Sequence, residues 1–153
     1  MTAASRPRPP WAATPPDTGR VAAAGLGWLR TAIGLAMLAA PSLLPRLLGA
    51  DRTTARRLDY LTRMVGIREV ALGAGTLRAV QVHDDPRPWV AAQAASDAGD
   101  GLSVGLALGH ARVNRLAGGM IVVFALVGVA ADLVTHRLVA QARDAGRRPI
   151  RRV

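Results

Sequence analysis

The chain has 153 residues, of which 50% are hydrophobic but only 3% aromatic, and its mean hydropathy is +0.22. Soluble cores of this size usually depend on Phe and Tyr for buried area, and this chain has one of each. All 20 basic residues are arginines, giving a formal net charge of +10 and a bias typical of a GC-rich bacterial genome. The absence of Cys excludes disulfides and thiolate metal sites.

The excess of positive charge is also a feature of nucleic-acid-binding proteins. Many of the arginines crowd the last part of the chain, where the positive-inside rule of membrane topology accounts for them equally well. We therefore expect a lipid bilayer as the main partner, and no nucleic acid.

Residues 1–20 combine prolines with arginines, a composition that predicts a disordered tail. A cleaved signal peptide is the alternative, because a basic start followed by an apolar run is its pattern. Arg30 interrupts that run, and no convincing cleavage site precedes Pro41. The sequence therefore favours an uncleaved first span.

Four stretches are long enough to cross the core of a bilayer, which takes about 20 helical residues. We expect transmembrane spans at about residues 21–45, 60–82, 89–109 and 116–139. The last is the clearest, since Leu116–Ala131 contains no charged residue and has no polar face. The linker at residues 46–59 is polar and rich in arginine, and a short surface helix is expected there.

These stretches predict an all-α, up-down bundle of four transmembrane helices with a disordered N-terminal tail and a basic C-terminal tail at residues 140–153. A soluble four-helix bundle is the alternative, because the second and third stretches contain charges. Two helices without a polar face would leave large exposed apolar patches on such a small domain, which favours the membrane. The distribution of arginines predicts that both termini lie on the cytoplasmic side of a bacterial plasma membrane.

Five charged residues lie well inside the predicted spans: Arg30, Arg68, Glu69, Asp97 and Asp100. Each unpaired charge at mid-membrane costs about 2.5–3.5 kcal/mol on insertion scales. With a rise of 1.5 Å per residue, all five fall within a slab about 8 Å thick, so we expect them to neutralise one another. Three are acidic and two basic, which leaves one carboxyl to be protonated or to meet a cation.

Four further polar residues are candidate members of this cluster: Arg63, Asp132, Gln93 and Ser96. Two of them share one helical face of the third span with its two aspartates. In a membrane helix such a face normally points into the bundle or into a water-filled cavity.

Three glycines follow at every fourth position on a neighbouring face of the same span: Gly101, Gly105 and Gly109. Small residues at this spacing allow two membrane helices to approach closely. We therefore expect this face to pack against another helix.

The acidic pair Asp97 and Asp100 could hold a divalent ion together with Glu69, but the ligand spacing of an EF-hand loop is missing. The sequence contains no Ser-His-Asp arrangement, phosphate-binding glycine loop or nucleotide-binding fingerprint. We expect no metal, no cofactor and no catalytic residue.

The segment from Arg63 to Glu69, followed by Gly73 and then by the acidic pair of the third span, resembles a family of small bacterial four-helix membrane proteins of unknown function. The shared features are a Gly-x-Arg-acid core in the second helix, acidic residues in the third helix and an arginine in the first. The resemblance covers about residues 21–139 and implies the four-helix architecture and the charge cluster, but no activity. The similarity to DoxX-like proteins is one of architecture alone.

Three hypotheses for the function follow. In the first, a non-enzymatic membrane protein uses the cluster to organise its bundle, as a homo-oligomer or beside a membrane partner. In the second, a small transporter or proton-linked carrier uses the cluster as a polar site at the midplane. In the third, which has the least support, a membrane enzyme acts on a lipid or a quinone.

Overall fold

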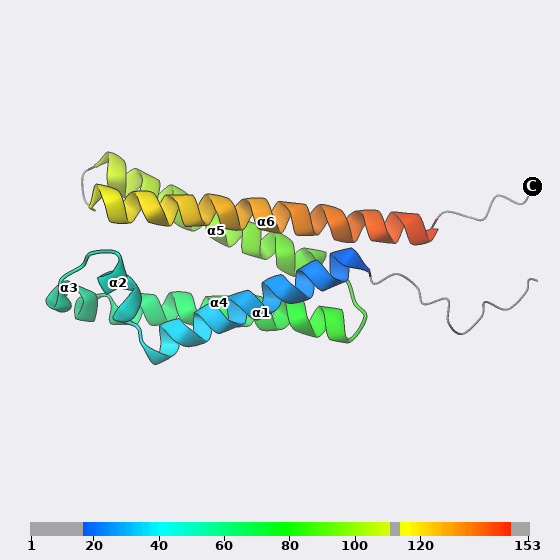
Figure 1. The fold of residues 1–153 in the computed structure, drawn as a ribbon, viewed down its shortest axis with the longest axis horizontal. Helices are drawn as coiled ribbons and strands as arrows, with labels where there is room; N and C mark the ends of the chain where they lie inside the picture. Colours follow the sequence, from blue (N-terminus) through cyan, green and yellow to red (C-terminus); the bar gives the residue numbers. More distant parts are fainter. Residues whose placement is uncertain (1–16, 111–113, 148–153) are drawn as a thin grey trace, which may run out of the picture.

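The structure, a computed structural model, describes residues 17–110 and 114–147 and is all-α (Figure 1). Its helices are α1 (Thr18–Ala39), α2 (Leu43–Leu47), α3 (Arg52–Arg57), α4 (Asp59–Gln81), α5 (Arg87–Gly109) and α6 (Arg115–Arg147). The four long helices run alternately in opposite directions, so the start of α1 and the end of α6 lie at the same end of the molecule.

The ends of α1 follow from local chemistry. The carboxylate of Asp17 accepts hydrogen bonds from the backbone N–H groups of Gly19 and Arg20, at 3.0 and 3.2 Å, and so caps the first turn. The helix stops at Ala39, several residues before the predicted end of the first span, because Pro41 cannot continue the backbone ladder. The short helix α2 takes up the end of the predicted first span and includes Pro45, and α3 is the short helix expected in the linker.

The other long helices begin within two residues of their predicted starts. The last helix is longer than predicted, because α6 continues past residue 139 to Arg147 and includes the first part of the expected basic tail. The carbonyl oxygen of the Asn114 side chain accepts from the N–H groups of Leu116 and Ala117 and caps α6. Nearly all of the predicted N-terminal tail lies outside the described residues.

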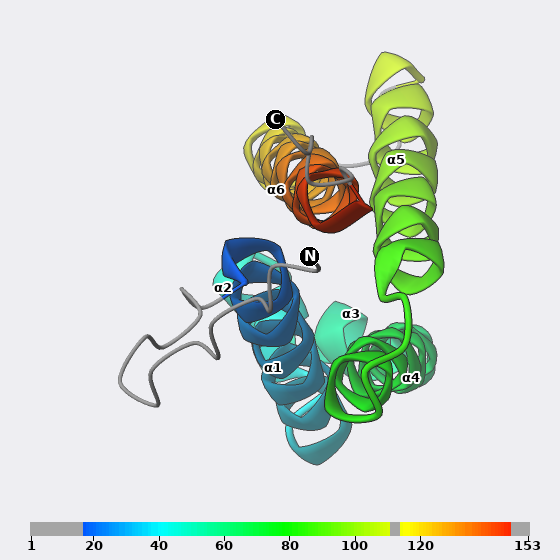
Figure 2. The same ribbon diagram turned by 90° about the vertical axis from the view of Figure 1, so that its right-hand side faces the viewer.

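The long helices pack as two pairs, α1 with α4 and α5 with α6, and the end-on view separates the pairs (Figure 2). Contact between the pairs is mainly between α1 and α6. Within the first pair, glycines let the backbones meet: Gly34 faces Gly66, and Gly27 faces Gly73. Both helices repeat these glycines after seven residues, or about two helical turns, which keeps them on one face.

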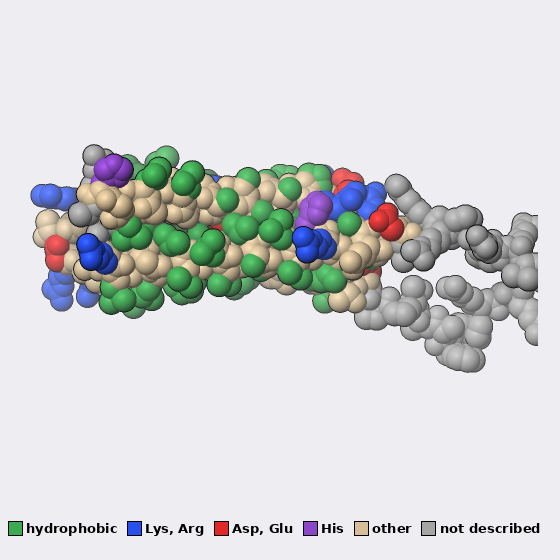
Figure 3. Space-filling view, turned by 90° about the horizontal axis from the view of Figure 1, so that it is seen from above, with side chains coloured by type: hydrophobic (Ala, Val, Ile, Leu, Met, Phe, Trp, Pro, Cys, Tyr) green, Lys and Arg blue, Asp and Glu red, His purple; other side chains and the backbone are tan. Residues whose placement is uncertain are grey.

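Small and polar side chains fill the space between the helices. The buried residues of α1 are glycines, Ala23 and Arg30, and those of α4 are glycines, threonines, Ala79 and Glu69. Large apolar residues such as Ile67, Leu102, Leu106 and Leu126 point outward. On the face shown in Figure 3, hydrophobic side chains are spread over the middle of the molecule and most charged ones lie toward its two ends.

Two of the described helices, α1 and α6, are long and apolar enough to cross a membrane. The other two long helices carry charged and polar residues within their apolar stretches, among them Arg68 and Glu69 in α4 and Asp97 and Asp100 in α5. The contacts of these charged side chains, described below, account for their presence in otherwise apolar helices.

Side chains at the end of the molecule where α1 begins and α6 ends tie the helices together. The guanidinium of Arg20 donates to the backbone carbonyls of Val80 and Asp84, at 3.2 and 2.8 Å. In the turn between α4 and α5, Asp85 accepts from Arg87 at 2.7 Å and also from Arg143 of α6. The carboxylate of Asp85 thus joins the turn to the last helix.

Because the backbones of α1 and α4 are in contact, we predict that a Gly→Ala substitution is tolerated only outside the face that the two helices share. A Cβ atom at Gly34 would lie 2.6 Å from the carbonyl oxygen of Gly66, whereas one at Gly25 of the same helix would meet nothing within 4 Å. We expect Gly34→Ala to lower the free energy of unfolding by about 1–3 kcal/mol. The matched control, Gly25→Ala, should be neutral or stabilise by up to about 1 kcal/mol. Thermal unfolding of the purified variants checks this, and an equal response of both would contradict the packing.

A second prediction concerns the stability of the fold at low pH. Hydrogen bonds from Arg87, assisted by the charge of Arg143, lower the pKa of Asp85 to about 2 from its ordinary value of 3.8. A carboxyl group whose pKa is lower in the folded state stabilises the fold above its unfolded pKa, and this contribution disappears as the pH falls through the folded value. Wild type should therefore be more stable than Asp85→Asn at pH 7, and the difference should vanish between about pH 4 and pH 2. A difference in thermal midpoint that is constant over this range would contradict the linkage.

Candidate functional site

A single guanidinium, that of Arg30 in α1, contacts one carboxylate from each of the other three long helices. Its Nη1 donates to Glu69 Oε2 of α4 at 2.7 Å and to Asp97 Oδ1 of α5 at 3.1 Å. Its Nη2 donates to Asp97 Oδ2 at 2.5 Å and to Asp132 Oδ2 of α6 at 3.0 Å. Arg30 and Asp97 thus form a bidentate pair, with a further carboxylate on each side of it.

This group of ion pairs is buried. Arg30 is 6% exposed, Glu69 is equally buried, and Asp132 is not exposed at all. The predicted buried charge cluster that links the helices therefore exists around Arg30. At such burial the energy of the ion pairs largely offsets the cost of removing the charges from water, so their main effect is on how the helices must fit together.

A second arginine extends the cluster toward the surface. Arg68 donates from Nη1 and Nη2 to the two carboxylate oxygens of Asp100, at 3.0 and 2.5 Å, and from Nη2 to Glu69 Oε1 at 3.3 Å. Glu69 therefore bridges the two arginines, with one oxygen on each. The side chains of Arg68 and Asp100 are 35% and 41% exposed, so this end of the cluster is the more accessible one.

The four candidate further members have different positions. Asp132 is a direct partner of Arg30. Gln93 is buried, but its amide donates to Thr76 Oγ1 at 2.7 Å, away from the cluster, and Ser96 Oγ is buried with no hydrogen-bond partner. Arg63 is exposed and forms no ion pair within the described part of the chain, because its position on α4 faces outward.

The close packing predicted for the glycines of α5 is present at one position only. A Cβ atom at Gly101 would lie 3.1 Å from Ala125 of α6, whereas those at Gly105 and Gly109 would meet no neighbour within 4 Å. Residues four apart on an α-helix drift by about 40° per step, so a four-residue repeat leaves the contact face after one or two steps. Gly105 and Gly109 therefore make no close contact with the other described residues of this chain, and a packing role for them stays a prediction.

One glycine that the sequence analysis did not identify contributes to the cluster. A Cβ atom at Gly128 of α6 would overlap the carboxylate of Asp97. Gly128 lies one helical turn before Asp132, so the two residues share a face of α6. This spacing from a buried acid is the signal in the sequence that could have identified it.

The cluster contains more acid than base. Arg30 and Arg68 face four carboxylates, those of Glu69, Asp97, Asp100 and Asp132, so full ionisation would leave two uncompensated negative charges. The sequence analysis also predicted more acids than arginines in the cluster, although it counted only Glu69, Asp97 and Asp100 and not Asp132. Two polar atoms of the Arg30–Asp132 pair, Arg30 Nε and Asp132 Oδ1, are buried without a hydrogen-bond partner.

A cavity of about 520 Å³ opens beside the cluster, between the two helix pairs. Apolar side chains of α1 and α6 form much of its wall, among them Leu29, Ile33, Ile121, Phe124 and Val127. Five charged side chains also line it: Arg30, Arg68, Glu69, Asp97 and Asp100. The cavity therefore combines an apolar wall with one charged side.

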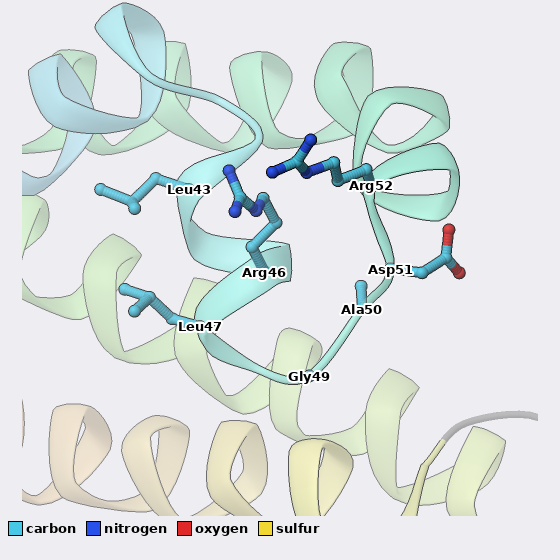
Figure 4. Close-up of a pocket in the computed structure, with 7 residues that line it drawn as sticks. All are labelled: Leu43, Arg46, Leu47, Gly49, Ala50, Asp51 and Arg52. Atoms are coloured by element: carbon cyan, nitrogen blue, oxygen red, sulfur yellow. The ribbon is translucent and has the colours of Figure 1, made fainter.

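A second, more open pocket lies at the corner formed by α2 and α3 (Figure 4). Arg46 and Arg52 line this pocket together with Leu43 and Leu47, and the close-up shows the Asp51 carboxylate pointing away from the two arginines. Asp51 instead caps α3, and its hydrogen bond from the hydroxyl of Thr54 lowers the pKa of Asp51. The corner thus presents arginines and leucines together.

Within the described residues, no group of three or more His, Asp or Glu side chains is placed to hold a metal ion. Glu69, Asp97 and Asp132 direct their carboxylates at the same guanidinium.

No family model, curated protein or solved structure matches the chain. The resemblance to small bacterial four-helix membrane proteins thus stays a prediction.

The geometry of the cluster predicts that Arg30 is required for a stable fold. Arg30→Gln leaves three buried carboxylates without their shared partner, and removal of one member of a buried ion pair typically costs about 3–5 kcal/mol. The matched control is Arg63→Gln, the same substitution at an exposed arginine of α4, which should change stability by less than about 0.5 kcal/mol. Thermal unfolding of the purified variants measures both, and similar midpoints would show that the cluster does not hold the helices together.

Proposed function

We propose that this chain is an integral membrane protein whose four long helices cross the bilayer, and that the charge cluster around Arg30 organises the bundle and does no catalysis. The observation that carries the proposal is the distribution of residue types between the inside and the outside of the molecule. A soluble protein buries its large apolar side chains and exposes its charges.

Here this distribution is reversed. The buried apolar residues are small, mainly Ala and Val, while the buried polar residues include Arg30, Glu69, Gln93 and Asp132. The exposed residues include two dozen large apolar side chains, with Leu116 at 76% exposure. In water such a surface would favour aggregation. A bilayer provides the apolar surroundings that these side chains need, so the reversed distribution supports membrane insertion.

The lengths of the helices also suit a bilayer. At 1.5 Å per residue, α1, α4 and α5 each measure about 33–35 Å, close to the thickness of a hydrocarbon core of about 30 Å. The longer α6 would extend beyond it. The charges near the middle of α4 and α5 do not oppose this placement, because Glu69, Asp97 and their arginine partners face one another between the helices. Arg63 and Arg78 are exposed near the two ends of α4, where long side chains can reach a membrane surface.

The corner at α2 and α3 supports the same placement. Leu43 and Leu47 are exposed beside Arg46 and Arg52, and short segments that combine apolar and basic side chains lie at the surface of membranes. We place this corner at one membrane surface and both chain ends at the other. The arginine-rich C-terminal region favours the cytoplasm of a bacterial cell for the chain ends.

The role of the cluster follows from the nature of helix association in lipid. Apolar side chains gain little by leaving lipid for another apolar surface, so packing of small residues and polar contacts must hold membrane helices together. The glycine contacts fasten α1 to α4, and Arg30 ties this pair to Asp97 and Asp132 of the other. Burial of each charge then depends on all four helices being in place.

Cysteine labelling tests this placement, because the natural chain has no Cys. Ala71 near the middle of α4, Ala98 near the middle of α5 and Thr53 in α3 are all exposed on the molecule itself. In cell membranes a membrane-impermeant maleimide should label Thr53→Cys and should not label Ala71→Cys or Ala98→Cys, because lipid covers the last two. All three should react after unfolding in SDS, which controls for the reactivity of each thiol.

The labelling pattern decides two separate questions: whether α4 and α5 lie in lipid, and on which side of the membrane the chain ends lie. Labelling of all three variants in native membranes would mean that α4 and α5 are in water, which contradicts the proposal. Labelling of Thr53→Cys from the outside of intact cells is expected for cytoplasmic chain ends, and labelling only after permeabilisation would reverse that orientation.

A further inference from the structure

The cavity between the two helix pairs has the dimensions of a ligand site. Its volume of about 520 Å³ lies within the range of about 300–1,000 Å³ typical of small-molecule pockets. Such pockets are mostly apolar with a few polar groups that orient the ligand, and this one has an apolar wall with charged groups on one side. The structural role proposed for the cluster does not require such a space.

The charges around the cavity favour a positive occupant. Two arginines and three carboxylates line it, and Asp132 lies behind them on Arg30. The surplus of negative charge must be compensated in surroundings of low polarity, either by protons on the carboxyl groups or by a cation. An anion would add to the surplus.

The accessible part of the charged side is the ion pair of Asp100 and Arg68, whose side chains are 41% and 35% exposed. Both oxygens of Asp100 accept from Arg68. Among the carboxylates that line the cavity Asp100 is the most exposed, because the side chain of Asp97 is 14% exposed and that of Glu69 only 8%. A cation that enters between the helix pairs would therefore meet Asp100 first.

The opposite wall determines what kind of cation fits. Leu29, Ile33 and Val127 provide no oxygen ligand for a metal ion, and they favour an apolar surface instead. Phe124, the only Phe in the chain, also lines the cavity, and an aromatic ring attracts an organic cation through its π face. We propose that the cavity binds a hydrophobic organic cation, with its positive charge toward Asp100 and its apolar body against α1 and α6.

This inference goes beyond the proposed function but assumes its membrane setting. Two probe ions of the same shape and opposite charge test it: tetraphenylphosphonium and tetraphenylborate. Binding to the purified, detergent-solubilised full chain is measured by equilibrium dialysis, with the same detergent on both sides to cancel partition into micelles. We expect saturable binding of tetraphenylphosphonium and at least tenfold weaker binding of tetraphenylborate.

The variant Asp100→Asn removes the accessible charge and should weaken tetraphenylphosphonium binding at least tenfold. Asp144→Asn is the matched control, because Asp144 is an exposed aspartate of α6 that does not line the cavity. It should bind as wild type does. Equal binding by wild type and folded Asp100→Asn would overturn the proposal.

A second pair of variants keeps the test decisive if Asp100→Asn does not fold. Phe124→Ala removes part of the wall without changing a charge, and Leu126→Ala removes an equally exposed apolar side chain of α6 that does not line the cavity. Only Phe124→Ala should weaken binding. No saturable binding to wild type, equal binding of both probes, or equal effects of these two variants would overturn the proposal and leave the labelling test of membrane placement unaffected.

Discussion

The arrangement of the long helices depends on the Arg30 guanidinium, which has one carboxylate partner on each of the other three. Arginine suits this position because its planar group offers five N–H donors in a fixed geometry, and four contacts to carboxylate oxygens are made here. A lysine would supply one charge but could not pair with Asp97 through two parallel hydrogen bonds. Apolar contacts allow a helix to slide along its neighbours or to rotate about its own axis. These directional contacts instead fix both the position of the helix along its axis and its rotation.

The glycine contacts and the charge cluster have complementary roles. Gly27 and Gly34 let α1 approach α4 until backbone meets backbone, which holds Arg30 and Glu69 at the same level. On the other side, Gly128 leaves room for the Asp97 carboxylate beside α6. Each charged side chain thus reaches its partner because a residue without a side chain lies nearby. Beside the cluster the two pairs separate and leave the cavity open between them, so the same arrangement that closes one part of the bundle leaves another part open.

Much of the charge cluster could be predicted from the sequence, because a regular helical rise converts position into depth. Arg30, Glu69 and Asp97 had to find partners if their helices were to lie in apolar surroundings. Asp132 lies in the second half of the predicted span at residues 116–139, because no local pattern indicates that α6 continues to Arg147; in the structure it lies near the middle of that helix. Helix rotation is harder to predict, and the four-residue spacing of the α5 glycines alone does not tell that only Gly101 has a close neighbour among the described residues. The cavity depends on the angle between the helix pairs, which no local pattern encodes.

The division of charges between the two helix pairs has a consequence for biosynthesis. The first pair contains both cluster arginines and Glu69, so an Arg30–Glu69 contact can form as soon as α1 and α4 meet. The second pair contributes three acids, Asp97, Asp100 and Asp132, and no cluster arginine. If the helices cross the bilayer as proposed and enter it in chain order, the α1–α4 pair can form with Glu69 shared between its two cluster arginines, which leaves one positive charge. The α5–α6 pair has no cluster arginine of its own, so its release from the insertion machinery and its docking onto the first pair should occur as one event.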